Sequence, residues 1–416
     1  MAPHGQVRSE GATLDGPESR YAWRRLFLSL LLSTIGGIGL WSNVVVLPAL
    51  QADFGVARGS ATLPYTLTMI GFAFGGIWMG RLADRRGVVF PVSVGAIALS
   101  IGYIASAQAT NLWQFAIVQG AVVGLLGSSA TFGPLVADIS HWFTRNRGIA
   151  VAICASGNYL SGTVWPPILQ HLVANYGWRE THIGIGIFCA VTMLPMGLLL
   201  RRPTPIAAAP AHPLAPSTEA GVPISPNALQ ALLVVAGLAC CVAMSMPQVH
   251  IVAYCADLGY GVARGAEMLS LMLGLGVVSR LASGWISDHI GGVRTLLVGS
   301  ALQCLTLIFY VPFDGLASLY VVSALFGLAQ GGIVPSYAMI VREYFPAREA
   351  GTRVGLVLMA TVIGMALGGW MSGAIYDITG SYRAAFANGV LWNAVNLAIA
   401  MFLLSRSRGR SLLRAA

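Results

Sequence analysis

Uncharged apolar segments of about 20 residues recur along nearly the whole chain. Hydrophobic residues make up 56% of the 416 residues and charged residues only 9%, whereas a typical soluble domain carries about a quarter charged residues. A helix of about 20 apolar residues is long enough to cross the hydrocarbon core of a bilayer. The chain is therefore predicted to be an all-α protein that crosses a lipid bilayer many times.

The apolar segments divide into two sets of six, which predicts twelve transmembrane helices in two six-helix bundles. The first set lies at residues 26–50, 61–80, 88–107, 112–137, 148–171 and 180–200. The second set lies at residues 227–252, 266–287, 293–312, 316–341, 352–376 and 382–404. The predicted division is an N-terminal tail (1–25), a first bundle (26–200), a Pro- and Ala-rich linker (201–226), a second bundle (227–404) and a C-terminal tail (405–416).

The two halves also share sequence motifs. The phrase Gly80-Arg-Leu-Ala-Asp84-Arg-Arg-Gly87 returns 204 positions later as Gly284-Trp-Ile-Ser-Asp288-His-Ile-Gly291. Two further echoes at similar offsets make chance similarity a poor explanation. Duplication of this kind is typical of transporter folds built from repeats, so the bundles are predicted to be pseudo-symmetric.

The distribution of basic residues predicts the orientation in the membrane. All 24 basic residues are Arg, and 19 of them fall in the two tails and the even-numbered connections. The positive-inside rule then places both termini in the cytoplasm of a multi-pass plasma membrane protein, here assigned to a bacterial inner membrane. The net charge of +9 reflects this topology and contact with anionic lipid headgroups, so no nucleic-acid partner is expected.

The Gly-x-x-x-Asp-Arg-x-Gly phrase between the second and third segments resembles the signature loop of the major facilitator superfamily. Within that superfamily the chain is most similar to monocarboxylate transporters and oxalate:formate antiporters. Three stretches carry this second resemblance: Trp41 to Pro48, Val249 to Gly259 and Arg280 to Asp288. The resemblance implies two bundles that enclose a central cavity and open it alternately to each side of the membrane.

The signature loops supply the residues predicted to control this alternation. Gly80 and Gly284 are expected to permit close helix approach, and Asp84 to accept hydrogen bonds at a helix start beside its counter-charge Arg85. Asp288 in the second copy is followed by His289, which weakens the charge network there. Asp138 lies where superfamily members often place an acid that joins the network, although a solvated interfacial carboxylate is an equal alternative.

Arg280 is the strongest candidate for a substrate-binding residue. It precedes Asp288 by eight residues, which places it ~12 Å into the bilayer. An arginine at that depth costs at least about 2.5–3.5 kcal/mol unless something compensates its charge. The position four residues earlier, often acidic in monocarboxylate transporters, is Gly276. The missing partner is therefore predicted to be a substrate carboxylate, and the alternative is pairing with helix-end carbonyls or snorkelling to the cytoplasm.

Four other polar residues complete the predicted site. His250, seven residues before Asp257, lies about 10 Å inside the outer face and is the candidate proton carrier; a neutral, hydrogen-bonded histidine is an equally good interpretation. Asn43, Asn158 and Gln330 lie in segments that line the cavity in the superfamily. They are candidates for orienting the substrate, although buried amides more commonly bond neighbouring helices.

The leading hypothesis is a proton-coupled symporter of small monocarboxylates such as lactate or pyruvate, functional as a monomer and without a cofactor or metal. One alternative is a carboxylate exchanger of the oxalate:formate type, which in that family uses a Lys in the eleventh helix; here no cation lies between Val354 and Tyr376. Another is a transporter-like carboxylate sensor. The chain carries no HExxH, GxSxG, GxGxxG or P-loop pattern, so an enzyme is not expected.

Overall fold

The computed structural model describes residues 17–202 and 225–413 and is helical in both halves. Ten helical segments of the described chain are long and apolar enough to cross a membrane. All twelve expected segments lie on helices, and the two outside the ten are 61–80 on α4 and 148–171 on α8 and α9. The all-α, two-bundle prediction is therefore confirmed, and the helix count agrees with twelve.

In the first half, several membrane crossings are each built from more than one helix. The first crossing is α1 (Arg20–Gly36) and α2 (Ile38–Phe54), which meet at Gly37. The fifth crossing is α8 (Arg147–Ala155) and α9 (Gly157–Tyr176), which meet at Ser156. The remaining elements of this half are α3 (Arg58–Ala61), α4 (Leu63–Arg86), α5 (Val89–Ala107), α6 (Leu112–Val118), the π-helical η1 (Gln119–Gly127), the 3-10 turn η2 (Ser128–Thr131), α7 (Gly133–Trp142) and α10 (Trp178–Leu198).

The second half repeats this order with fewer breaks. Its elements are α11 (Pro226–Asp257), α12 (Val262–Ile290), α13 (Gly292–Phe309), α14 (Leu316–Gln330), α15 (Ile333–Tyr344), α16 (Ala347–Thr379) and α17 (Tyr382–Leu413). α14 and α15 separate at Gly331 and Gly332, which lie 204 positions after Gly127 and Ser128, where η1 gives way to η2. The repeat therefore preserves the place where the fourth and tenth crossings bend.

Glycines allow the backbones of these bent crossings to pack directly on their neighbours. A Cβ added to Gly124 would overlap the carbonyl oxygen of Thr68 on α4, and one added to Gly327 would overlap that of Met272 on α12. Thr68 and Met272 are again 204 positions apart. Such close packing through small residues is how transmembrane helices associate without a hydrophobic driving force.

Two predicted boundaries differ from the helices. α1 begins at Arg20, inside the predicted N-terminal tail, because Ser19 caps it by accepting a hydrogen bond from the Ala22 amide. α17 continues to Leu413, inside the predicted C-terminal tail. Most of the predicted linker and the start of the N-terminal tail lie outside the described residues, so the linker stays a prediction.

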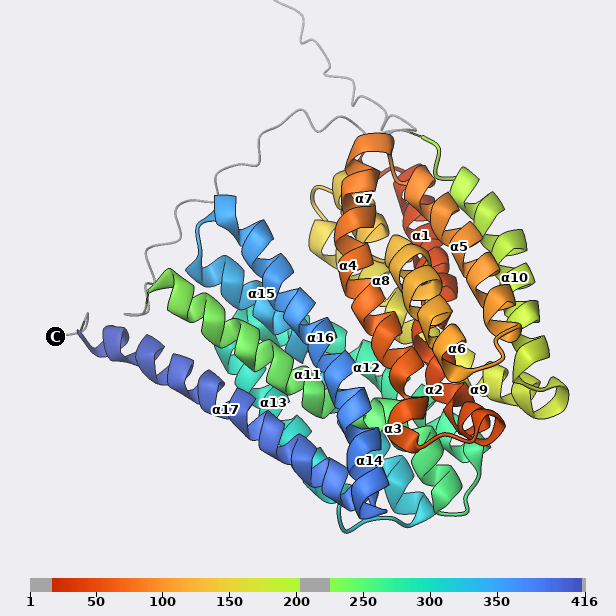
Figure 1. Ribbon diagram of the computed structural model, residues 1–416. Coiled ribbons are helices and arrows are strands. Elements are labelled where there is room, and N and C mark those ends of the chain that lie inside the picture. The colour runs from red at the N-terminus through yellow and green to blue at the C-terminus, as the bar shows by residue number, and fades with distance from the viewer. Residues whose placement is uncertain (1–16, 203–224, 414–416) are drawn as a thin grey trace, which may run out of the picture.

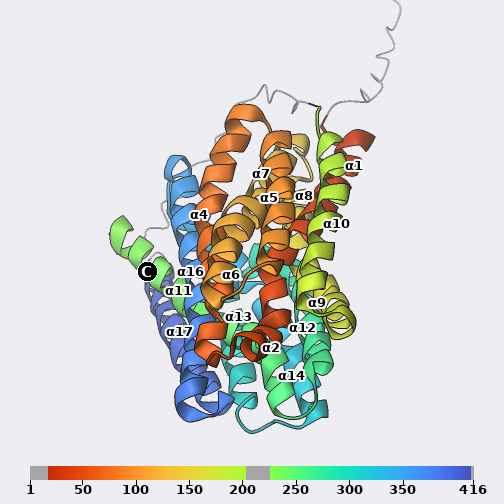
Figure 2. The same ribbon diagram turned by 45° about the vertical axis from the view of Figure 1, so that its right-hand side comes forward.

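The two halves touch at one end of the molecule and separate at the other (Figure 1). α10 ends and α11 begins at the separated end, which we call the linker end. The halves meet through α9 with α12, α16 with α3 and α4, and α11 with α2. Turning the view by 45° shows α9 beside α12 as well (Figure 2). With the predicted orientation, this conformation is open toward the cytoplasm and closed on the outer side.

Candidate substrate site

Arg280 lies on α12 where the two halves begin to separate. Its Nη1 donates a hydrogen bond to the carbonyl oxygen of Ala155 on α8, at 3.0 Å. Its guanidinium lies over the ring of Tyr159 on α9, with Cζ 4.9 Å from the ring centroid. Among the hydrogen bonds between the halves in the described chain, this one is closest to the linker end. Within the described chain, the hydrogen bond and the ring contact of this second-half side chain therefore both come from the first half.

The charge of Arg280 lacks an anionic partner in the described part of the chain. No carboxylate forms an ion pair with it, and its Nε is buried without a hydrogen-bond partner. A carbonyl and an aromatic face both stabilise a cation, but neither neutralises it. The side chain thus retains an unused N–H and a net positive charge at the junction of the halves.

The three predicted amides are divided among different clusters. Asn43 is buried on α2 and its Nδ2 donates to Thr68 Oγ1 at 3.1 Å and to Gln119 Oε1 at 3.3 Å. Gln330 is buried at the end of α14 and accepts from Gln248 Nε2 at 2.6 Å. The contacts of both are those of amides that bond neighbouring helices, the alternative interpretation.

Asn158 is the amide closest in sequence to the partners of Arg280. It directly precedes Tyr159, and its backbone carbonyl accepts a hydrogen bond from Trp41 Nε1 at 3.2 Å. Its Oδ1 is buried without a partner in the described chain, as are Asn43 Oδ1 and Gln330 Nε2. Within the described part of the chain, Asn158 thus has an unpartnered amide oxygen next in sequence to Tyr159, and its role in orienting a substrate stays a prediction.

His250 is fully buried on α11, nearer the closed end. Its Nε2 lies 2.8 Å from the carbonyl oxygen of Gly369, and its Nδ1 lies 2.9 Å from the hydroxyl of Tyr382. A carbonyl only accepts, so Nε2 carries a proton and Nδ1 accepts from the tyrosine. A neutral imidazole satisfies both contacts.

The closed end is held by Arg58, whose role the sequence did not reveal. Arg58 belongs to α3 of the first half, and its Nη2 donates to Asp257 at 3.0 Å while its Nη1 donates to the Tyr382 hydroxyl at 2.8 Å. The Tyr382 hydroxyl thus accepts from Arg58 and donates to His250. Burial disfavours the charged form, but Tyr382 and Asp257 outweigh it and raise the pKa of Arg58 above its ordinary value.

A second carboxylate from the second half caps α3. Asp377 accepts hydrogen bonds from the backbone amides of Arg58 at 2.8 Å and Gly59 at 2.7 Å. The contact at Gly59 is tight, because a Cβ there would lie 3.1 Å from the Ala374 amide nitrogen. The backbones of α3 and α16 therefore meet directly, and the negative charge lies at the amide-rich start of a helix.

The predicted gating residues lie at the linker end, away from the contact between the halves. A Cβ at Gly80 or Gly284 would meet nothing within 4 Å, because the halves are apart there. Neither glycine makes a close contact with another described helix in this conformation, and their role in close helix approach stays a prediction. α4 runs through Asp84 and Arg85 to Arg86. Asp84, Arg85 and Asp288 have no ion pair or hydrogen bond within the described chain.

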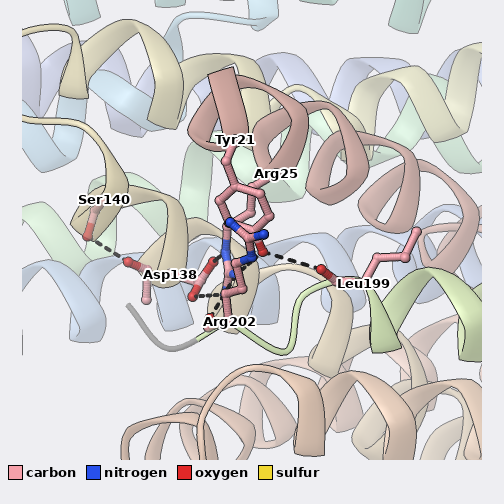
Figure 3. Close-up of polar contacts among 7 residues, drawn as sticks. Tyr21, Arg25, Asp138, Ser140, Leu199 and Arg202 are labelled. Atoms are coloured by element: carbon pink, nitrogen blue, oxygen red, sulfur yellow. Dashed lines mark hydrogen bonds and ion pairs between the residues drawn. The ribbon is translucent and has the colours of Figure 1, made fainter. Parts of the chain in front are cut away.

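Asp138 has a different partner from the one expected. Its two oxygens accept hydrogen bonds from Arg25 Nε at 2.7 Å and Arg25 Nη2 at 2.8 Å (Figure 3). Arg25 is only 1% exposed and also donates to the Tyr21 hydroxyl and to the Arg202 carbonyl. This bidentate pair joins α1, α7 and the end of the first half, while Asp84 lines the adjoining cavity of about 650 Å³.

The fold and sequence together define the class of protein. The Major Facilitator Superfamily model matches residues 29–318 and 294–415, so the chain belongs to this superfamily and is a transporter of that kind.

Known relatives place it more closely. It is 27% identical to Monocarboxylate transporter 13 of Bos taurus over 321 residues, which cover 75% of this chain and 73% of that one. It is 30% identical to Monocarboxylate transporter 11 of Mus musculus over 325 residues, covering 73% and 70%. A crystal structure of the nucleoside transporter NupG, solved as a point mutant, has the same fold, with a TM-score of 0.69 at 15% identity, covering 92% and 99%.

Proposed function

We propose that this protein is a proton-coupled symporter of small monocarboxylates such as lactate or pyruvate. The observation that carries the proposal is the Nε of Arg280, buried without a partner on a cation that no carboxylate neutralises in the described chain. A guanidinium edge matches the two oxygens of a carboxylate, and one fixed cation balances one anion. The names of the relatives support a small organic anion as the substrate.

The junction of the halves explains how such binding would be coupled to movement. Arg280 belongs to the second half, and its protein partners Ala155 and Tyr159 belong to the first. When the halves rock, the positive charge of Arg280 moves away from Ala155 and Tyr159. A carboxylate bound at Nε would neutralise that charge during the movement. The loaded carrier would then pass through the intermediate conformation at a lower cost than the empty one, as symport requires.

His250 is the proposed proton carrier because it lies behind the contact that closes the opposite end. When His250 gains a proton, Nδ1 no longer accepts from Tyr382, and a second positive charge appears on the far side of that hydroxyl from Arg58. Asp257 and Asp377 are the acidic groups nearby. Like-charge repulsion between His250 and Arg58 would then favour opening of that end.

The direct test is uptake of labelled lactate into proteoliposomes, with and without an inward proton gradient. We expect the gradient to drive accumulation by the wild type and the Arg280→Ala variant to lose uptake. Uptake that ignores the gradient but is stimulated by internal carboxylate would replace symport with exchange. Binding without flux would indicate a sensor instead.

The proton role has its own variant and control. His250→Gln should lose stimulation by the gradient while retaining exchange of labelled for unlabelled lactate. His182→Gln is the matched control, because His182 is an equally buried histidine of the first half whose Nδ1 lies 2.7 Å from the Trp178 carbonyl oxygen. Retained gradient dependence in His250→Gln would assign the proton to another group.

A further inference from the structure

We propose that Tyr159 is a positioning residue for Arg280 and that Gly276 provides the space it occupies. The two residues lie on opposite halves and together fix how the guanidinium is presented to an anion. The inference rests on the proposed function, in which Arg280 binds the substrate carboxylate. It adds two residues that determine the strength of that binding without touching the substrate.

Two contacts from neighbouring turns of the first half hold the guanidinium. The Ala155 carbonyl oxygen accepts a hydrogen bond from Nη1 at 3.0 Å. The Tyr159 ring covers one face of the guanidinium, with its centroid 4.9 Å from Cζ. Residues 155 and 159 are four apart and therefore lie on the same side of the helical path, even though it breaks at Ser156. The Tyr159 ring fixes the plane of the guanidinium, and the hydrogen bond to Ala155 fixes its rotation within that plane.

The edge that remains carries Nε and Nη2. Nε has no partner in the described chain, and this edge is one of the two that can grip a carboxylate with parallel hydrogen bonds. Because the ring covers one face, an anion meets Arg280 edge-on. Without the ring, the Arg280 side chain would be mobile in the empty site. Each binding event would then cost the conformational entropy of ordering it.

Gly276 is the position that admits the ring. A Cβ added there would lie 2.6 Å from Cε1 and 2.7 Å from Cδ1 of Tyr159. Gly276 also lies one turn before Arg280 on the same face of α12, so the ring rests against the backbone of the helix that carries the arginine. Any side chain at 276 must displace the ring from beneath the guanidinium.

α12 cannot move back to relieve such a clash. On another side of the helix lies Gly331, directly after the end of α14. A Cβ on Gly331 would overlap the Gly276 carbonyl oxygen and would lie 2.9 Å from the Arg280 amide nitrogen. The backbone at 276 is therefore held between Gly331 and Tyr159. The strain of a larger residue at this position falls on the ring rather than on the helix.

Transport kinetics in proteoliposomes test the proposal through the conservative variant. Tyr159→Phe keeps the ring face and should retain the wild-type KM for lactate, whereas Tyr159→Leu should raise KM about 3- to 30-fold, the range expected for one cation–π contact. Gly276→Ala should raise KM similarly. Gly355→Ala on α16 is the control, because a Cβ there meets nothing within 4 Å, and it should behave as the wild type.

A wild-type KM in Tyr159→Leu would overturn the inference while leaving the proposed function intact. Equal losses in the Phe and Leu variants would also overturn it, since the ring face would then be irrelevant.

A readout without substrate keeps the inference testable even if the wild type carries no carboxylate, a result that would end the proposed function. Phenylglyoxal modification of Arg280, followed by peptide mass spectrometry, should proceed several-fold faster in Tyr159→Leu and Gly276→Ala than in the wild type and Tyr159→Phe. Arg179, on the first half and paired with Asp53, is the internal reference. Equal rates at Arg280 in all four proteins would show that Tyr159 does not hold it.

Discussion

Arg58 and Arg280 each connect the two halves, but their surroundings differ in one respect that matters for function. Arg58 meets the carboxylate of Asp257 and the hydroxyl of Tyr382, and Asp377 caps the helix that carries it. Arg280 meets only a carbonyl and a ring within the described chain. A neutralised arginine stabilises one conformation, whereas an arginine without an anion has affinity left for a ligand. Arg58 therefore makes a closing contact, and Arg280 is the candidate for binding the substrate.

Substitution by lysine at both positions should give the largest difference between the two arginines. Lysine keeps the charge but loses the planar fork. Arg280→Lys should therefore raise KM for lactate by about 10- to 100-fold, a loss of ~1.4–2.7 kcal/mol typical of a charge-assisted bidentate bond. Arg58→Lys should leave KM near the wild-type value. Uptake kinetics in proteoliposomes measure both, and equal shifts in the two variants would erase the distinction.

Removing the charge of Arg58 should open the end that it closes. Arg58→Gln leaves Asp257 unpaired, which we expect to cost the closed state about 1–3 kcal/mol, less than for a fully buried pair because Asp257 is 29% exposed. Spin labels at Ala52 and Ala263, exposed positions of the two halves, should then report a second, longer distance. The labels are attached to cysteines introduced at these positions. Cys304, which is partly exposed, is replaced first so that it is not labelled.

Arg280→Gln is the matched control for this measurement, since that side chain pairs with no carboxylate in the described chain. We expect its distance distribution to resemble the wild type at the closed end. An unchanged distribution in Arg58→Gln would mean that helix packing alone closes this end.

Tyr382→Phe should open the closed end less than Arg58→Gln does. It removes the hydroxyl between Arg58 and His250 but leaves the Arg58–Asp257 pair in place. One hydrogen bond contributes about 0.5–1.5 kcal/mol, so the population of the open form should rise about two- to tenfold. The same spin-label pair measures it, and an effect larger than that of Arg58→Gln would place the closing contact on the tyrosine.

The features that could be predicted from the sequence are those set by the spacing of apolar residues and by a residue's expected depth in the membrane. The twelve apolar segments, the duplication and the exceptional position of Arg280 all follow from the order of residues along the chain. The breaks at Gly37, Ser156 and Gly331 did not follow, because hydropathy alone does not distinguish a straight crossing from a bent one. The π-helical turn at Gln119–Gly127 was equally invisible.

The partners of the site residues could not be predicted, because they come from the opposite half. Ala155 offers only a backbone carbonyl, which no motif identifies. The role of Arg58 could not be predicted either, since nothing in the sequence relates it to Asp257, 199 residues away. Gly276 was noted for the acid it lacks, whereas its space for Tyr159 emerges only from the packing of α9 on α12.

Equilibrium binding of lactate to the purified protein, measured by calorimetry, tests whether Arg280 is the residue that binds the carboxylate. The wild type, Arg280→Ala and Arg58→Gln would be measured side by side, with thermal unfolding as a check on folding. We expect the wild type and Arg58→Gln to bind lactate and a folded Arg280→Ala to show no binding. Binding by Arg280→Ala with the wild-type affinity would contradict this expectation, because the carboxylate would then have another partner.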